Sequence, residues 1–404
     1  MKKVLFVDDE PDVLRGLRRM LRAMRDEWEM YFVESGPEAL ALLEQDHFDV
    51  IVSDMRMPGM NGAELFARVR EKYPHMIRII LSGFSDQSLL SKAARHSHQF
   101  LTKPCDSETL KKSVKRVSDL QDILSGERVK SIIAQTDSLP SLPFLYNKII
   151  QKLQEKDVSI AEIGGIIEQD ISMTAQILKL VNSSFFGFFK NIANPVQAAS
   201  LLGIDTIKTL VLSIEIFSIL KTDSGHRFPF EKLWERSTLC AGFAKLIAGQ
   251  VSKDKQFIDD AFSAAFLMDI GILLLASKLP QEYNRVLSHA EQNKYPLFRA
   301  ERQVLESSHA EIGAYLLGLW GFPENIVEAV ARHHKPDIFG DEPQSLITVL
   351  HLSDVFVERI FKMSANLYLG NKDEKYLSEL NLDEKSQEWF TMCEKMYRNE
   401  GVDG

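Results

Sequence analysis

Acidic residues, a hydroxyl and a lysine follow short apolar runs in the first third of the chain. Asp8 and Asp9 follow one run, Asp54 a second, and Ser82 and Lys103 two more. Neighbouring carboxylates repel one another unless a cation neutralises them, and Mg²⁺ prefers such oxygen ligands. A carboxylate nucleophile flanked by a metal, a lysine and a hydroxyl could accept a phosphoryl group. Any one of these residues alone could be a solvated turn former, but together they favour phosphoryl chemistry.

The apolar runs alternate with amphipathic segments up to about residue 122, which is typical of a doubly wound parallel α/β sheet. We expect strands at residues 3–7, 31–33, 50–53, 77–81 and 99–101, and helices at 12–24, 37–44, 63–73 and 106–121. Functional groups gather at the carboxyl ends of the strands in such sheets. This fold therefore predicts that the residues above lie together.

Four segments, "VLFVDDE", "DVIVSDMRMPGMNG", "IILSG" and "FLTKP", resemble the receiver domain of two-component response regulators. The resemblance implies a flavodoxin-like α/β fold and a sensor histidine kinase or phosphotransfer protein as partner. It assigns Asp54 as the phosphorylated residue and Lys103 as its phosphoryl contact. It also implies that Asp8, Asp9, Asp54 and the Arg56 carbonyl hold Mg²⁺, and that Ser82 and Phe100 form the switch pair.

The second half of the chain raises a different question, because "FLMDIGILL" places Asp269 within an apolar run. A buried carboxylate is hydrogen-bonded, metal-bound or protonated, since burying an unpaired charge is costly. Around it, apolar residues recur three and four positions apart. Ser159 and Glu162 have the spacing of a helix capping box. We predict an all-α domain over residues 138–365.

The segments "LPSLP", "IIEQDISMTAQILKLVNSSFFG" and "AASLLGIDTIKTLVL" resemble the HDOD domain, a relative of the HD phosphohydrolases and of the HD-GYP cyclic-di-GMP phosphodiesterases. By this resemblance, Arg236 and Met268 stand where an HD enzyme has metal-binding histidines. A thioether cannot replace imidazole toward hard metals. The remaining members of this degenerate HD site are Asp269, His309, His333, His334 and Asp354. We therefore expect no transition metal and no catalysis in this domain.

The remaining polar residues of the degenerate HD site are expected to be structural. Asp269 is most simply a buried carboxylate that accepts hydrogen bonds. For each histidine, a hydrogen-bonded role within the helices is favoured over metal ligation. His333 and His334 would lie about 100° apart on a helix, so at most one easily faces a given pocket.

The whole chain of 404 residues divides into a receiver domain (1–122), a helical linker (123–137), the HDOD domain (138–365) and a C-terminal helical extension (366–404). Lys and Arg number 19 against 20 Asp and Glu in residues 1–122, and 22 against 26 in residues 138–365. This balance makes a nucleic-acid partner unlikely. The three cysteines and the lack of a long apolar run indicate a cytoplasmic protein that does not contact a membrane.

These patterns predict a response regulator of a two-component phosphorelay, in which Asp54 phosphorylation switches a non-catalytic HDOD output that binds an unidentified protein. A homodimer is possible. One alternative is a metal-dependent cyclic-di-GMP phosphodiesterase of the HD-GYP type, which the residues at positions 236 and 268 oppose. The other is a DNA-binding transcriptional regulator, which the acidic output domain opposes.

Overall fold

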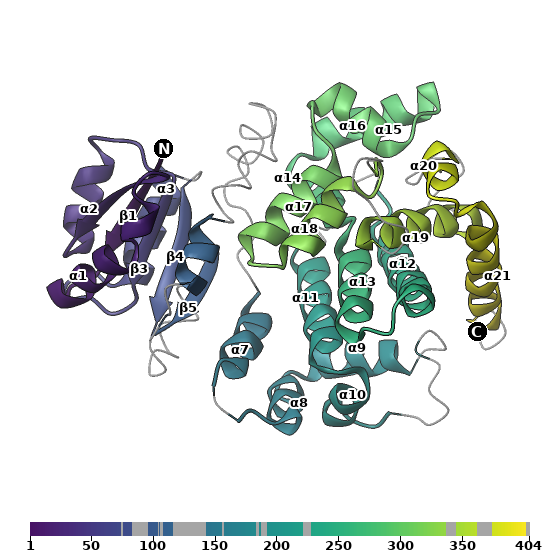
Figure 1. Ribbon diagram of the computed structural model, residues 1–404, viewed down its shortest axis with the longest axis horizontal. Coiled ribbons are helices and arrows are strands. Elements are labelled where there is room, and N and C mark those ends of the chain that lie inside the picture. Colours follow the sequence, from purple (N-terminus) through teal and green to yellow (C-terminus); the bar gives the residue numbers. More distant parts are fainter. Residues whose placement is uncertain are drawn as a thin grey trace. The chain divides into compact units, whose positions relative to one another are not determined.

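The computed structural model describes most of the chain in two compact units (Figure 1). The described residues are 1–73, 76–82, 96–103, 105, 108–115, 143–155, 157–182, 186, 192–220, 228–336, 345–361 and 374–400. Residues 1–154 and 315–322 cluster as one unit, and residues 155–314 and 323–404 as the other. The first unit contains a sheet and the second is helical.

The first unit is built on a five-stranded parallel sheet of order β2-β1-β3-β4-β5. The strands are β1 (Lys2–Val7), β2 (Trp28–Val33), β3 (Val50–Asp54), β4 (Ile77–Ser82) and β5 (Gln99–Thr102). The predicted strands agree with these to within three residues, so the doubly wound α/β fold is confirmed. In the register, Ser53 lies opposite Val7 and Asp54 opposite Leu81, which aligns the carboxyl ends of the strands.

Helices connect the strands of this sheet. They are α1 (Pro11–Met20), the 3₁₀ turn η1 (Arg22–Met24), α2 (Gly36–Leu43) and α3 (Gly62–Lys72), while residues 108–115 are helical and α7 (Phe144–Leu153) follows later in the chain. Ser35 and Asn61 begin α2 and α3 by accepting hydrogen bonds from backbone N–H groups three residues later, as N-cap residues do. The helix predicted over residues 12–24 divides into α1 and η1.

The second unit contains only helices among its described residues. Its elements are α8 (Ile160–Glu168), α9 (Ile171–Val181), α10 (Pro195–Leu202), α11 (Ile204–Leu220), α12 (Phe230–Val251), α13 (Lys255–Leu267), α14 (Ile270–Lys278), α15 (Pro280–Asn293), α16 (Leu297–Leu305), α17 (His309–Leu319, of which residues 315–319 cluster with the first unit), α18 (Glu324–Arg332), α19 (Leu346–Ile360), α20 (Glu374–Glu379) and α21 (Asp383–Glu400). The predicted capping box is present, with both reciprocal bonds between Ser159 and Glu162.

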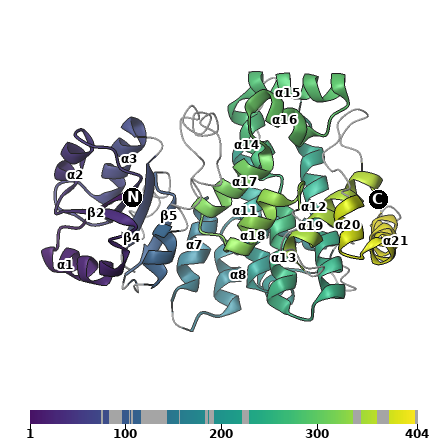
Figure 2. The ribbon, with the colours of Figure 1, turned by 45° about the horizontal axis from the view of Figure 1, so that its top comes forward.

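The core of the helical unit forms where α12 packs against α13 and α19. Figure 2 shows α15 and α16 side by side at one end of this unit, and α21 beside α19 at another. α14 is apolar around its whole circumference, and its residues from Ile270 to Ala276 are buried. A helix of this kind belongs in the interior of a domain.

Two sequence predictions fall outside the described residues: the linker at 123–137, and the end of the helix predicted over residues 106–121. Within the described part, no single helix is long and apolar enough to cross a bilayer. One sharply bent pair, Lys255–Lys278 with Pro280–Asn293, passes that test on length and composition alone.

Candidate functional site

A buried pair of carboxylates lies at the carboxyl end of the sheet, where Lys103 bridges them. Asp8 follows β1 and Asp54 ends the neighbouring strand β3. The Lys103 ammonium donates to Asp8 Oδ2 at 2.7 Å and forms an ion pair with Asp54 Oδ1. The sequence-predicted phosphoacceptor, one predicted metal ligand and the predicted phosphoryl contact therefore meet at one place.

Backbone N–H groups hold the other oxygens of the two carboxylates. The Glu10 N–H donates to Asp8 Oδ1 at 3.0 Å, and the Arg56 N–H donates to Asp54 Oδ2 at 2.6 Å. The start of α3 packs closely below Asp54, because a Cβ added at Gly62 would lie 2.3 Å from the Asp54 carbonyl oxygen. Residue 62 thus needs to be glycine for this approach.

The remaining predicted members of the acidic site lie nearby or cannot be placed fully. Asp9 is half-buried beside Asp8, and Ser82 is buried at the end of β4, where its carbonyl accepts from the Lys103 N–H at 2.8 Å. Phe100 lies in β5, but its side chain is outside the described residues. The switch-pair assignment therefore stays a prediction.

The charge balance at Asp54 suits a divalent cation. Burial raises the pKa of Asp54, although Lys103 acts against this shift. Asp8, Asp9 and Asp54 supply hard oxygen donors, which are the ligands that Mg²⁺ prefers. The Mg²⁺ implied by the sequence resemblance therefore fits this donor set.

The second cluster of charged residues lies inside the helical unit, around Arg236 of α12. Its guanidinium donates from Nη1 to Asp269 Oδ2 at 2.5 Å and from Nη2 to Asp354 Oδ1, and all three side chains are buried. Burial alone would raise the pKa values of both carboxyls, but the neighbouring guanidinium lowers them. Asp269 is thus an ionised carboxylate paired with arginine, which is one of the hydrogen-bonded roles expected for it.

Three histidines complete this buried cluster. His309 Nδ1 lies 2.6 Å from Glu301 Oε2, and His309 Nε2 lies 3.4 Å from Asp269 Oδ1. His334 Nε2 lies 2.8 Å from His309 Nε2, and His333 Nε2 lies 3.9 Å from Asp269 Oδ1. Four of the residues named for the degenerate HD site, Asp269, His309, His333 and His334, therefore offer donor atoms within 4.8 Å of one another.

Both adjacent histidines face the same cluster, so the expectation that only one would do so is wrong. The spacing of about 100° applies inside a helix, but α18 ends at Arg332. His333 is the residue that caps this helix, and His334 lies beyond it in a turn. His333 itself keeps helical backbone angles, so the reason lies in the carboxylates, which come from two elements: His333 Nε2 is 3.9 Å from Asp269 Oδ1, and His334 Nδ1 is 3.3 Å from Asp354 Oδ2 of α19.

The protonation of the three rings differs in the metal-free protein. Burial disfavours the imidazolium of His309, but Glu301 and Asp269 together raise the pKa of His309 to about 10. For His334, burial lowers the pKa to about 3, and burial lowers the pKa of His333 as well. The cluster therefore holds one imidazolium and two neutral imidazoles near pH 7.

Backbone geometry positions Asp269 at the break between α13 and α14. It is the N-cap residue of α14, but its side chain accepts from Arg236 rather than from the helix. A Cβ added at Gly271 would lie 2.1 Å from the His309 carbonyl oxygen, so α14 and α17 approach backbone to backbone. This close crossing brings Asp269 next to the His309 ring.

Sequence reasoning missed Glu301 and the charge-pairing role of Arg236. Glu301 is fully buried in α16, where Tyr283 donates to its Oε1 at 2.8 Å and the His309 N–H donates to its Oε2 at 2.8 Å. No motif marks Glu301, since it stands in a charged stretch, "RAERQ". Met268 is buried directly before Asp269.

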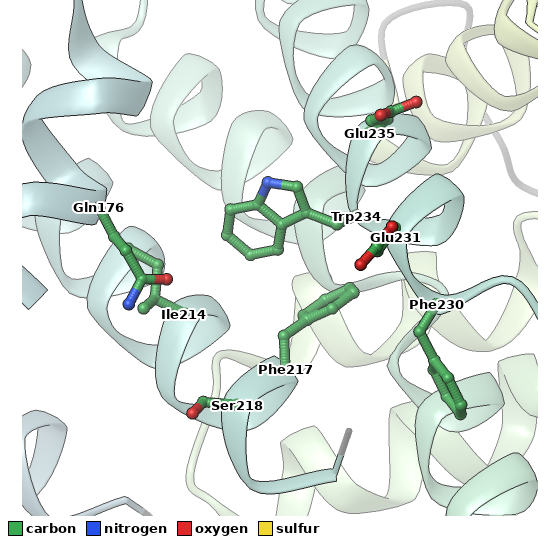
Figure 3. Close-up of a pocket in the computed structure, with 8 residues that line it drawn as sticks. All are labelled: Gln176, Ile214, Phe217, Ser218, Phe230, Glu231, Trp234 and Glu235. Carbon is green, nitrogen blue, oxygen red and sulfur yellow. The ribbon is translucent and has the colours of Figure 1, made fainter. Parts of the chain in front are cut away.

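A pocket of about 440 Å³ lies over α11 and α12 in the same unit (Figure 3). It is lined by Gln176, Ile214, Phe217, Ser218, Phe230, Glu231, Trp234 and Glu235. The Phe217 and Trp234 rings meet edge to face, with centroids 4.9 Å apart. This accessible aromatic surface with acidic neighbours is separate from the buried cluster.

Comparisons with known families fit both halves of the molecule. The sequence profile of the response regulator receiver domain matches residues 4–115, and that of the HDOD domain matches residues 139–336. The chain is a response regulator receiver domain joined to an HDOD domain. This finding confirms the resemblance drawn from the sequence motifs.

Individual relatives and solved structures match this chain only in part or at low sequence identity. The hydrogenase transcriptional regulatory protein HoxA of Cupriavidus necator is 32% identical over 152 residues, covering 37% of this chain and 30% of HoxA. An HDOD domain protein from Geobacter sulfurreducens covers 70% of this chain and 98% of its own, at 20% identity and a TM-score of 0.51. A structure from Marinobacter aquaeolei VT8 covers 90% of this chain and 87% of its own, at 20% identity and a TM-score of 0.53. The two structures show the fold alone, and the chain spans less than half the length of the curated relatives it matches first.

Proposed function

We propose that Asp54 of the receiver domain accepts a phosphoryl group from a kinase or phosphotransfer protein, and that the HDOD domain passes on the signal by binding a partner protein. The observation that supports the first half is the Lys103 bridge between Asp8 and Asp54. When bound, Mg²⁺ would offset the charge of the incoming phosphoryl group. In this proposal Lys103 would contact that group, and Asp54 would form the new bond.

The proposal that the HDOD domain is not an enzyme rests on Arg236. A hydrolase of the HD type needs several ligands around a metal that activates water. Here a guanidinium lies between Asp269 and Asp354 and occupies one oxygen of each. The guanidinium cannot bind and activate a water molecule as a metal ion does. Because it lies between these two carboxylates, it disfavours the binding of two catalytic metal ions there.

Phosphorylation is expected to act by changing the balance between receiver conformations and thereby the surface offered to the partner. The pocket beside Trp234 is the contact surface that we propose for this partner, because part-exposed aromatic side chains are common anchors of protein interfaces. We place this activity in the cytoplasm, with Mg²⁺ in the receiver domain.

Incubation with acetyl phosphate and Mg²⁺, followed by intact-mass analysis, tests the phosphoacceptor. We expect one phosphoryl group on the wild type and on Asp26→Asn, an exposed control, and none on Asp54→Asn. Phosphorylation of Asp54→Asn at the wild-type rate would contradict the assignment.

Affinity capture from cell extract with phosphorylated and unphosphorylated protein tests the output. We expect a partner whose recovery depends on phosphorylation and falls with Trp234→Ala. Hydrolysis of cyclic-di-GMP with added Mn²⁺ or Fe²⁺ would instead favour the phosphodiesterase alternative. A gel shift with DNA at physiological salt would favour the DNA-binding alternative. We test this alternative because HoxA, one of the relatives, is a transcriptional regulatory protein.

A further inference from the structure

Three imidazole nitrogens and one carboxylate oxygen converge inside the HDOD domain. His309 Nε2 lies 3.4 Å from Asp269 Oδ1, His333 Nε2 lies 3.9 Å from the same oxygen, and His334 Nε2 lies 2.8 Å from His309 Nε2. Within the described part of the chain, Asp269 Oδ1 and His333 Nε2 have no hydrogen-bond partner although both are fully buried. Buried polar atoms without a partner are rare and point to a missing ion or water.

For two of the histidines, the second ring nitrogen lies at hydrogen-bond distance from an acceptor: His309 Nδ1 is 2.6 Å from Glu301 Oε2, and His333 Nδ1 is 2.7 Å from the Val330 carbonyl oxygen. His334 Nδ1 lies 3.3 Å from Asp354 Oδ2, and neither atom has a hydrogen-bond partner among the described residues. An Nδ1–H that donates outward leaves Nε2 as the inward donor atom for an ion. Metal-binding histidines are oriented in this way by carboxylates and backbone carbonyls.

The carboxylate of Asp269 is oriented by the same principle. Arg236 Nη1 holds Oδ2 at 2.5 Å and leaves Oδ1 directed at the histidines. For a tetrahedral ion with bonds of about 2.0–2.1 Å, donor atoms lie about 3.3 Å apart. Three of the separations, 2.8, 3.4 and 3.9 Å, lie on both sides of that value, and all four donor atoms lie within 4.8 Å of one another.

We propose that Asp269, His309, His333 and His334 bind one transition-metal ion of the zinc type. Nitrogen and carboxylate donors in a four-coordinate arrangement are those of Zn²⁺. All four positions are taken by protein side chains, so the site is closed and its role is structural: it joins the α13–α14 break to the start of α17 and the end of α18. The ion needs the inward Nε2 atoms unprotonated, because only an unprotonated nitrogen ligates.

This inference does not rest on the proposed function, since a closed metal site fits a binding domain and leaves no position for reactive water. Glu301 and Arg236 then act as positioning residues that orient His309 and Asp269. The sequence-based expectation that the domain holds no transition metal is the opposing outcome of the test below.

The test measures Zn²⁺ binding to full-length protein stripped with a chelator. Elemental analysis after dialysis against Zn²⁺, competition with a chromogenic chelator and melting curves with and without Zn²⁺ give content, affinity and stabilisation. We expect about one tightly bound Zn²⁺ per chain and a higher melting temperature with the ion. A tetrahedral ligand-field spectrum with Co²⁺ reports the geometry.

Variants locate the site. His309→Gln and His333→Gln should lose the tight ion and the Zn²⁺-dependent rise in melting temperature, and Glu301→Gln should bind it about 10- to 100-fold more weakly. His47→Gln, an exposed histidine of the receiver domain, is the matched control and should bind as the wild type does. Circular dichroism checks that each variant is folded. If a variant does not fold, the titration of the wild type with Zn²⁺ alone decides whether the chain binds the ion.

Two results would overturn the proposal: no stoichiometric ion and no thermal shift in the wild type, or equal Zn²⁺ affinity in the wild type and His309→Gln. Neither result bears on whether the domain binds a partner protein. Metal-dependent turnover of a cyclic dinucleotide would contradict the non-catalytic output and show that the site is open, and thus would also overturn its closed, structural role.

Discussion

The receiver and HDOD domains neutralise paired carboxylates in similar ways but with different access to solvent. In each domain one basic side chain contacts two buried carboxylates: Lys103 with Asp8 and Asp54, and Arg236 with Asp269 and Asp354. The Lys103 side chain is 29% exposed, whereas the Arg236 side chain is 0% exposed. Because Lys103 borders solvent, a phosphodonor can approach its carboxylates and the charge pattern there can change.

The buried arginine has the opposite consequence. Separating a guanidinium from two carboxylates inside a protein leaves charges without hydration, which costs several kcal/mol. Exposed ion pairs can exchange partners cheaply, since water screens the charges. The same chemical pairing thus forms a site that can change its charge in one domain and a fixed cross-link between α12, α14 and α19 in the other.

Replacing Arg236 should produce the largest loss of stability. In metal-free protein, Arg236→Met keeps much of the side-chain volume but leaves two buried carboxylates unpaired, so we expect unfolding to become easier by about 3–5 kcal/mol. Urea denaturation measures this change. Arg285→Met, which removes an exposed ion-pair partner in α15, should change stability by less than about 0.5 kcal/mol. Equal effects of the two substitutions would refute the contrast.

The crossing of α14 and α17 allows a comparison between two glycines of the HDOD domain. Gly271→Ala places a methyl group against the His309 carbonyl, and we expect a loss of about 1–3 kcal/mol as the helices separate. Gly249→Ala, in α12 with no atom within 4 Å of the new Cβ, should stabilise by about 0.5–1 kcal/mol. Melting temperatures that shift in the same direction would show that the close approach is not required.

Removing the receiver lysine should cost less than removing Arg236. We expect Lys103→Met to destabilise by about 1 kcal/mol, because replacing this part-exposed side chain lets water and ions reach the two carboxylates that it covers. Lys72→Met, which breaks a pair with Glu44 in which both side chains are well exposed, should have almost no effect. A loss for Lys103→Met as large as that for Arg236→Met would mean that exposure does not separate the two clusters.

The sequence predicted the acidic site of the receiver domain better than the buried cluster for a physical reason. Parallel strands of alternating α/β units end at one edge, so the order of motifs alone places Asp8 near Asp54. No such rule relates α12 to α14, α18 and α19, whose packing depends on features such as the Gly271 crossing. The pairing of Arg236 with Asp269 and Asp354 could be read only from the structure.

The buried histidines show where local reasoning fails. The spacing of neighbouring residues on a helix did not predict that carboxylates from two elements meet at the end of α18, where His333 contacts Asp269 and His334 contacts Asp354. Glu301 has no sequence signal at all, because a buried glutamate is recognised by its partners rather than by its neighbours in sequence. The linker at 123–137 lies outside the described residues, so the predicted coupling between domains stays a prediction.

The thiols extend the comparison to its smallest expected effect. Burial raises the pKa of Cys393 to about 12 and also raises that of Cys240, so both remain protonated at pH 8 in the folded helical unit. Cys105 of the receiver domain is half-buried. Since the thiolate is the reactive form, a thiol reagent at pH 8 should label about one cysteine quickly in native protein and all three in urea.

The raised pKa of Cys393 also makes the stability of the fold depend on pH. Above the ordinary thiol pKa the unfolded thiol ionises while the folded one does not, so the free energy of unfolding should decline from about pH 9 toward pH 12. Cys393→Ala should make that decline slightly shallower, and a decline that is equally steep in this variant would contradict the assignment to Cys393.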